Sequence, residues 1–100
     1  MILSAISVSA STGFAEDLRC VLSNQLYGYT VQDDTHLVYN GMGKTKYMFN
    51  LSSGCNFHFA DYIGFRTFSS FQVCRGDDVM TYQREFGETG RCMIESIDKN

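Results

Sequence analysis

Two histidines and one nearby cysteine have the side chains that bind metal ions. Cys55 and His58 are three positions apart, and His36 is the other histidine of the chain. Structural zinc sites are normally built from closely spaced ligand pairs, whereas the remaining cysteines stand alone. We therefore expect no metal ion and no cofactor, with His36 on a strand and His58 exposed on a short helix.

Two acidic pairs, Asp33-Asp34 and Asp77-Asp78, offer carboxylate oxygens of the kind that calcium prefers. Neither pair lies in an EF-hand loop with its glycine and closing glutamate. Aspartate is common in turns because its side chain hydrogen-bonds to nearby backbone groups. The sequence predicts that both pairs are turn residues.

Nucleophilic catalysis needs a serine or cysteine within hydrogen-bond reach of a base. Four serines lie near turn signals, but the chain has no Gly-x-Ser-x-Gly elbow. The run Gly41-Met42-Gly43-Lys44-Thr45 ends like a phosphate-binding loop, yet the earlier glycine is missing because position 38 is valine. We expect a hairpin turn there, no catalytic residue and no enzymatic activity. The four serines are Ser52, Ser53, Ser69 and Ser70.

Aromatic side chains are concentrated between Phe57 and Phe71. Such a cluster forms either a core or a surface that binds a peptide, lipid or glycan. A domain of this size needs most of its aromatic residues inside, which favours the core. The sequence leaves the choice between core and binding surface open.

Four cysteines, Cys20, Cys55, Cys74 and Cys92, are well separated and include no Cys-x-x-Cys. An even number of such cysteines in an exported chain indicates two disulfides. Four cysteines allow three pairings, and the sequence does not choose among them. We favour the nested pairing of Cys20 with Cys92 and Cys55 with Cys74, because the first bridge would tie the start of the domain to its last strand.

Alternation of apolar and polar residues predicts the strands that would hold these groups. Strands are expected over residues 27–32, 35–39, 44–51, 79–82 and 91–97, with a further extended run over 65–73. Asn40-Gly41 suits a tight connection between the second and third strands. Asn56 is expected to cap a short helix that ends at Gly64, and residues 87–90 to form a loop.

These elements predict a mainly β fold. We expect a small antiparallel sheet or partly open barrel of five to six short strands, with one short helix and disulfide staples. The chain of 100 residues fits one domain. A net charge of −3 argues against nucleic acid as a partner.

The first fifteen residues carry no charge and end in Gly13-Phe14-Ala15, whereas all the charged residues lie from Glu16 onward. Small residues before a possible cut are typical of a secretory signal. We therefore predict a signal peptide over residues 1–15 and a single β-rich domain over 16–100. No stretch is long enough to be a transmembrane segment.

A pattern of short segments runs from Tyr47 onward. The segments are Tyr47-Met48-Phe49-Asn50-Leu51, Cys55, Ala60, Ile63-Gly64, Asp77-Asp78-Val79 and Cys92-Met93-Ile94-Glu95-Ser96-Ile97. In these segments the chain resembles a family of small exported bacterial proteins that carry a domain of unknown function. The resemblance covers roughly residues 19 to 98, and it implies export and a β-rich fold but no activity or catalytic residues.

The expected function is that of an exported, periplasmic or secreted, monomeric and non-enzymatic domain that binds a protein or other ligand of the bacterial cell envelope. Two alternatives remain open at this point. One is a secreted effector, inhibitor or toxin-like protein, for which small size and two disulfides fit equally well. The other is a small enzyme or metal carrier, which requires a pocket that joins His36 or His58 to carboxylates.

Overall fold

The computed structural model describes residues 16–100, so the signal peptide expected over residues 1–15 lies outside the described part of the chain. Strands make up most of residues 16–100, which confirms the mainly β class. In chain order they are β1 (Glu16–Leu18), β2 (Cys20–Leu22), β3 (Tyr29–Asp33), β4 (His36–Asn40), β5 (Lys46–Leu51), β6 (Tyr62–Arg66), β7 (Gln72–Cys74), β8 (Asp78–Gln83) and β9 (Gly87–Lys99). Two single-turn 3₁₀ helices, η2 (Ser23–Gln25) and η3 (Phe57–Phe59), complete the described range.

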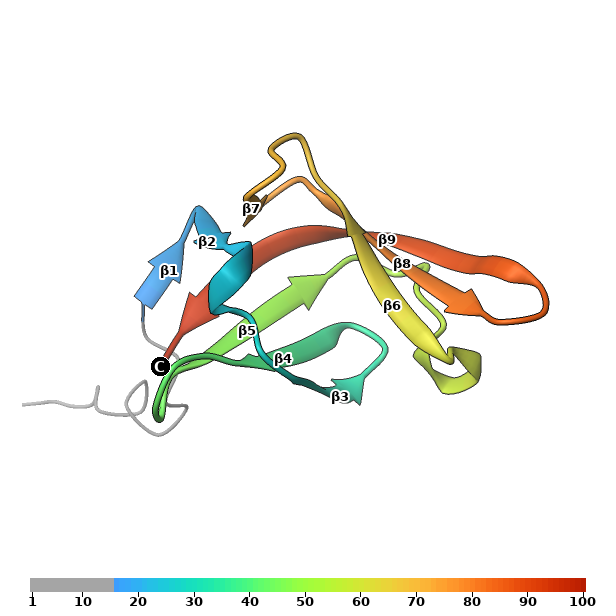
Figure 1. Cartoon of the computed structure of the whole chain (residues 1–100), viewed down its shortest axis with the longest axis horizontal. Coiled ribbons are helices and arrows are strands. Elements are labelled where there is room, and N and C mark those ends of the chain that lie inside the picture. The colour runs from blue at the N-terminus through green and yellow to red at the C-terminus, as the bar shows by residue number, and fades with distance from the viewer. Residues whose placement is uncertain (1–15) are drawn as a thin grey trace, which may run out of the picture.

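The 13-residue strand β9 is the central and longest strand of the main sheet. It pairs with β8 along its first half and with β5 and β1 along its second half, always antiparallel. The order of the main sheet is β3-β4-β5-β9-β8-β6, and β2 and β7 form a separate two-stranded sheet. Figure 1 shows β9 spanning the molecule along its long axis, with β6 inclined steeply to it.

The main sheet curls into a half-open barrel, as the sequence predicts. The two ends of its strand order are not paired with each other, so β3 and β6 remain open edges. Curling brings the ring of Phe65 on β6 to 5.6 Å from the ring of Tyr39 on β4, and to 5.8 Å from the ring of Phe49 on β5. These rings close the inner side of the curl without hydrogen bonds between the edges.

The predicted alternation decides which side chains enter the core. On β4 and β5 every second residue is buried, and the same rule holds over the first part of β8. Phe49, Leu37, Val79, Ile94 and Ile97 are almost completely buried. The core is thus assembled from the inward faces of β4 and β5 in the first half of the chain and of β8 and β9 in the second.

The expected helix between Asn56 and Gly64 is wrong in extent. Only Phe57–Phe59 turn helically, the side chain of Asn56 forms no cap, and Ala60 is already extended. The backbone N–H of Asp61 donates to the carbonyl of Tyr82, which draws the following residues into β6. Pairing with β8 therefore outcompetes the local helical pattern, and Gly64 lies within a strand.

The expected loop over residues 87–90 is also wrong, because these residues open β9. The turn precedes them, and Gly87 leaves it with a φ of 79°, which only glycine adopts readily. Glu88 then pairs with Tyr82 and Gly90 with Thr81. Residues 41–45 form the expected hairpin connection, where the N–H of Gly41 donates to the carbonyl of Thr45.

Candidate functional site

Both disulfides form, but the pairing differs from the nested one predicted. Cys20 is bonded to Cys74 and Cys55 to Cys92. The register explains the first bridge, because Cys20 and Cys74 lie directly opposite each other on β2 and β7. The ends of the domain do meet, because β1 pairs with the last residues of β9, but Cys20 lies beyond β1 on β2, and β9 carries Cys92 past the loop that holds Cys55. No described cysteine is free.

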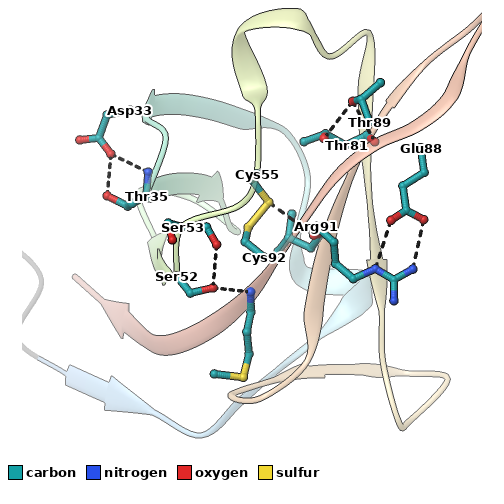
Figure 2. The surroundings of a disulfide bond; sticks show 12 residues. Asp33, Thr35, Ser52, Ser53, Cys55, Thr81, Glu88, Thr89, Arg91 and Cys92 are labelled. Atoms are coloured by element: carbon teal, nitrogen blue, oxygen red, sulfur yellow. Dashed lines mark hydrogen bonds and ion pairs between the residues drawn. A yellow bond between two sulfur atoms is a disulfide. The ribbon is translucent and has the colours of Figure 1, made fainter.

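The Cys55–Cys92 bridge fastens the loop after β5 onto β9 (Figure 2). Both cysteines are buried. Beside the bridge, a side chain on Gly54 would place its Cβ 2.4 Å from the carbonyl oxygen of Arg91. Ser52 extends the contact, since its N–H donates to the carbonyl of Met93 and its hydroxyl accepts from the N–H of Met93. The bridge is therefore part of a tight backbone junction and has a structural role.

Asp33, Thr35 and His36 have the side-chain types of a catalytic triad, and they meet at the turn between β3 and β4. The Asp33 carboxylate lies 2.8 Å from Nδ1 of His36, and the Thr35 hydroxyl lies 3.1 Å from the same nitrogen. In a catalytic relay the acid and the nucleophile contact opposite nitrogens of the histidine. Here both contact Nδ1, and the backbone N–H of Thr35 also donates to Asp33. The arrangement is that of a turn in which aspartate binds nearby backbone.

The geometry of this turn predicts how the Asp33 carboxyl titrates. The N–H of Thr35 and the side chain of His36 lower the pKa of the Asp33 carboxyl below its ordinary value of 3.8. A lowered folded-state pKa contributes stability above the unfolded value, and that stability is lost as the pH falls through the folded value. We expect an NMR titration of the Asp33 carboxyl carbon to have its midpoint below 3.8, and His36→Ala to raise that midpoint. A midpoint at or above 3.8 in the wild type would contradict the turn geometry.

The second acidic pair also has a structural role. Asp77 is only 2% exposed, and its carboxylate accepts the N–H of Cys74 at 2.8 Å. The backbone of the same residue accepts the N–H of Ile94. Asp77 thereby holds the turn between β7 and β8 against β9. Within residues 16–100, no group of three or more histidine, cysteine, aspartate or glutamate side chains is placed to hold a metal ion.

Ser69 and His58 lie on different connections between strands. The Ser69 hydroxyl accepts the N–H of Phe71 and belongs to the loop between β6 and β7. His58 is exposed on η3, as expected, although η3 is a single 3₁₀ turn. His36 lies on β4, also as expected.

The feature best suited to bind a ligand is a hollow of about 480 Å³ on the inner side of the curl. We call it the aromatic hollow, and it is open to solvent between β3, β4 and β6. Its volume lies in the usual range for small-molecule sites. Its lining consists of Ser23, Leu26, Tyr27, Tyr29, Tyr39, Phe65, Thr67 and Val73.

Strand pairing positions the aromatic rings of the hollow. Tyr29 and Tyr39 are direct partners in the β3–β4 ladder, with ring centroids 5.5 Å apart. Phe65 reaches Tyr39 from β6. Tyr27 and Tyr29 are 61% and 42% exposed, whereas Tyr39 is 8% exposed. The hollow thus has a buried aromatic floor and a rim of two accessible tyrosines.

Tyr39 has the most unusual environment of the lining residues. Burial raises the pKa of its phenol well above the ordinary value of 10.0, and the neighbouring Tyr29 adds to the effect. Within residues 16–100, no hydrogen bond to the Tyr39 hydroxyl is found, in contrast to Tyr47, whose hydroxyl donates to Gln25. Buried tyrosine hydroxyls usually have a partner. Tyr39 thus lines the hollow with a hydroxyl that has no hydrogen-bond partner among the described residues.

The aromatic cluster of residues 57–71 splits between core and surface. Phe57 is buried and Phe65 packs against the core, but Phe68 and Phe71 are 97% and 61% exposed. Sequence reasoning missed the hollow because its tyrosines lie before this cluster. The signal that points to them is the alternation of Tyr27 and Tyr29 with small or polar residues at the entry to β3, combined with Tyr39 on β4.

Within residues 16–100, no helix is long and apolar enough to cross a membrane. The described structure is that of a small, disulfide-bonded, antiparallel half-barrel with an uncharged aromatic hollow. This class of domain agrees with the resemblance drawn from the sequence.

Residues 4–100 match the model of a family described as "Family of unknown function (DUF6491)", and the chain belongs to this family. The comparison with curated proteins and the comparison with solved structures each found no match.

Proposed function

We propose that the chain is a non-enzymatic binding module that is exported to the bacterial cell envelope and holds its ligand in the aromatic hollow. The hollow carries this proposal. It combines a defined volume, accessible aromatic rings and a buried hydroxyl, which is the usual composition of a small-molecule site.

Export is supported by two features of the chain. All four cysteines of the sequence are paired in disulfides, and such bridges persist in oxidising compartments. The uncharged segment of residues 1–15 has the composition of a secretory signal. A binding role without catalysis is supported by the Asp33, Thr35 and His36 turn, where the acid and the hydroxyl share one nitrogen of the histidine.

The binding role predicts that a double variant, Tyr27→Ser with Tyr29→Ser, loses ligand. Both side chains are substantially exposed, so the fold is expected to survive their truncation. The test is ligand-observed NMR with a panel of purified envelope components, namely sugars, short peptides and lipid headgroups. At least one component is expected to bind the monomeric wild type, and to bind the double variant at least tenfold more weakly.

Phe86→Ser is the matched control, because Phe86 is an aromatic residue that is 77% exposed in the turn between β8 and β9. It is expected to bind like the wild type. If no component binds, or if Phe86→Ser loses binding as the double variant does, the hollow is not the functional site. Recovery of the protein only from the culture medium would favour a secreted effector or inhibitor over an envelope module.

A further inference from the structure

We propose that the ligand of the aromatic hollow is an uncharged sugar ring of a glycan chain. This inference rests on the proposed function and narrows it to one chemical class. Three properties of the lining carry it: the absence of charge, the number of hydroxyl groups, and the buried hydroxyl of Tyr39.

The absence of charge in the lining excludes ligands that would place a charged group in the hollow. None of the eight lining side chains is charged. A carboxylate, phosphate or ammonium group buried there would lose its hydration without gaining an opposite charge, which is strongly unfavourable. The part of the ligand that enters the hollow is therefore neutral.

Hydroxyl groups make a purely apolar ligand a poor fit. Five of the eight lining residues carry a hydroxyl: Ser23, Tyr27, Tyr29, Tyr39 and Thr67. A hydroxyl can both donate and accept a hydrogen bond, and the Thr67 hydroxyl, which already donates to the carbonyl of Ser69, can still accept one. An acyl chain or an apolar side chain would seal the Tyr39 hydroxyl away from water without a partner, and an unsatisfied buried polar group costs about 1 to 3 kcal/mol.

A sugar ring fits both the aromatic rings and the hydroxyl groups of the lining. Its faces expose C–H groups that can pack on the rings of Tyr29 and Phe65, and its edge carries hydroxyls that can pair with Tyr39 and Thr67. Tyrosine suits such a contact because it joins a broad apolar ring to a polar tip. The open mouth of the hollow leaves room for the flanking units of a chain, with Tyr27 at the rim.

The test uses the full chain with both disulfides formed, titrated with chitotriose, with maltotriose and with a neutral, end-capped Phe-Ala-Phe peptide. We expect at least one of the trisaccharides to shift the aromatic resonances of Tyr27, Tyr29 and Phe65. Tyr39→Phe keeps the ring and removes only the hydroxyl. It is expected to weaken trisaccharide binding by about three- to tenfold, the effect of one lost hydrogen bond.

Tyr62→Phe is the matched control, since Tyr62 lies outside the hollow and its ring stacks on Tyr82 at 5.0 Å. It is expected to bind like the wild type. The melting temperature gives a second readout: Tyr39→Phe should not be less stable than the wild type, because its hydroxyl has no partner to lose within the described residues.

Three other outcomes would each overturn part of the proposal. Unchanged trisaccharide affinity in Tyr39→Phe, or a clear fall in its melting temperature, overturns the role given to the hydroxyl and with it the sugar assignment. Binding of the peptide alone at the same resonances overturns the sugar class and leaves the proposed binding function standing. If neither the trisaccharides nor the envelope panel binds in the hollow, both proposals fail.

Discussion

A variant that lacks the buried bridge, Cys55→Ala with Cys92→Ala, is expected to lose about 4 kcal/mol of stability, which is the loop-closure contribution of a bridge spanning 37 residues. For a domain of this size that loss lowers the melting temperature by about 15 to 30 °C. The physical reason is that the bridge restricts the unfolded chain and also fills a buried position in the core cluster, to which both cysteines belong. Thermal unfolding followed by circular dichroism measures the effect.

The other bridge provides the comparison. Cys20–Cys74 spans 54 residues, so chain entropy alone ranks it as the more stabilising of the two. Its cysteines are only half-buried and join the short β2–β7 sheet. We expect packing to reverse this ranking, because removing the buried sulfur atoms of Cys55 and Cys92 also leaves a cavity in the core. We expect the Cys20→Ala/Cys74→Ala variant to be the more stable of the two, and the opposite order would contradict the structural role given to Cys55–Cys92.

Gly54→Ala is expected to destabilise the protein by about 3 to 5 kcal/mol, because it combines a strained backbone with a direct clash. Gly54 has a φ of 126°, and an added Cβ would lie 2.4 Å from the carbonyl oxygen of Arg91. This carbonyl belongs to β9 and cannot move without disturbing the central strand of the sheet. Chemical denaturation gives the free energy of unfolding directly.

The Gly76→Ala variant separates the cost of backbone strain from the cost of the steric clash. Gly76 also has a positive φ, of 90°, but an added Cβ would meet no atom within 4 Å. It is expected to lose only about 1 to 2 kcal/mol, the ordinary penalty for a side chain in this region of backbone space. Equal losses at Gly54 and Gly76 would show that the 52–56 loop is not closely packed on β9.

Local patterns predicted the elements that depend on local rules. The alternation in residues 44–51 indicates both the strand and its inward face, and β5 buries Tyr47, Phe49 and Leu51 as that pattern requires. The Asp33-Asp34 turn and the glycine-rich connection before β5 also follow from turn chemistry. Two open edges and a curled sheet agree with the predicted partly open barrel.

Features that depend on which strands become neighbours could not be predicted from local sequence patterns. The disulfide pairing follows from the β2–β7 register and from the passage of β9 beside Gly54, and neither leaves a signal near the cysteines. The expected helix after Asn56 gave way to β6 because Tyr62 pairs with Tyr82, twenty residues downstream.

The aromatic hollow was beyond sequence reasoning for the same reason. Its lining comes from β3, β4, β6 and the segments around η2 and β7, and these meet only when the sheet curls. Each of its tyrosines taken alone has the sequence context of an ordinary half-buried strand residue. What distinguishes Tyr39 is a hydroxyl without a partner in the described structure, and only the assembled fold reveals it.

Export and the disulfide framework are tested together by intact-mass measurement of the protein recovered from the exported fraction. The protein is treated with a thiol-alkylating reagent without reductant, and the same sample is then digested without reduction. The predicted result is a chain cut after Ala15 that takes up no alkyl group and yields peptides joined through Cys20–Cys74 and Cys55–Cys92. An uncut chain with four alkylated thiols would contradict an exported, doubly bridged binding domain, and peptides joined through Cys20–Cys92 would contradict the register of β2 on β7.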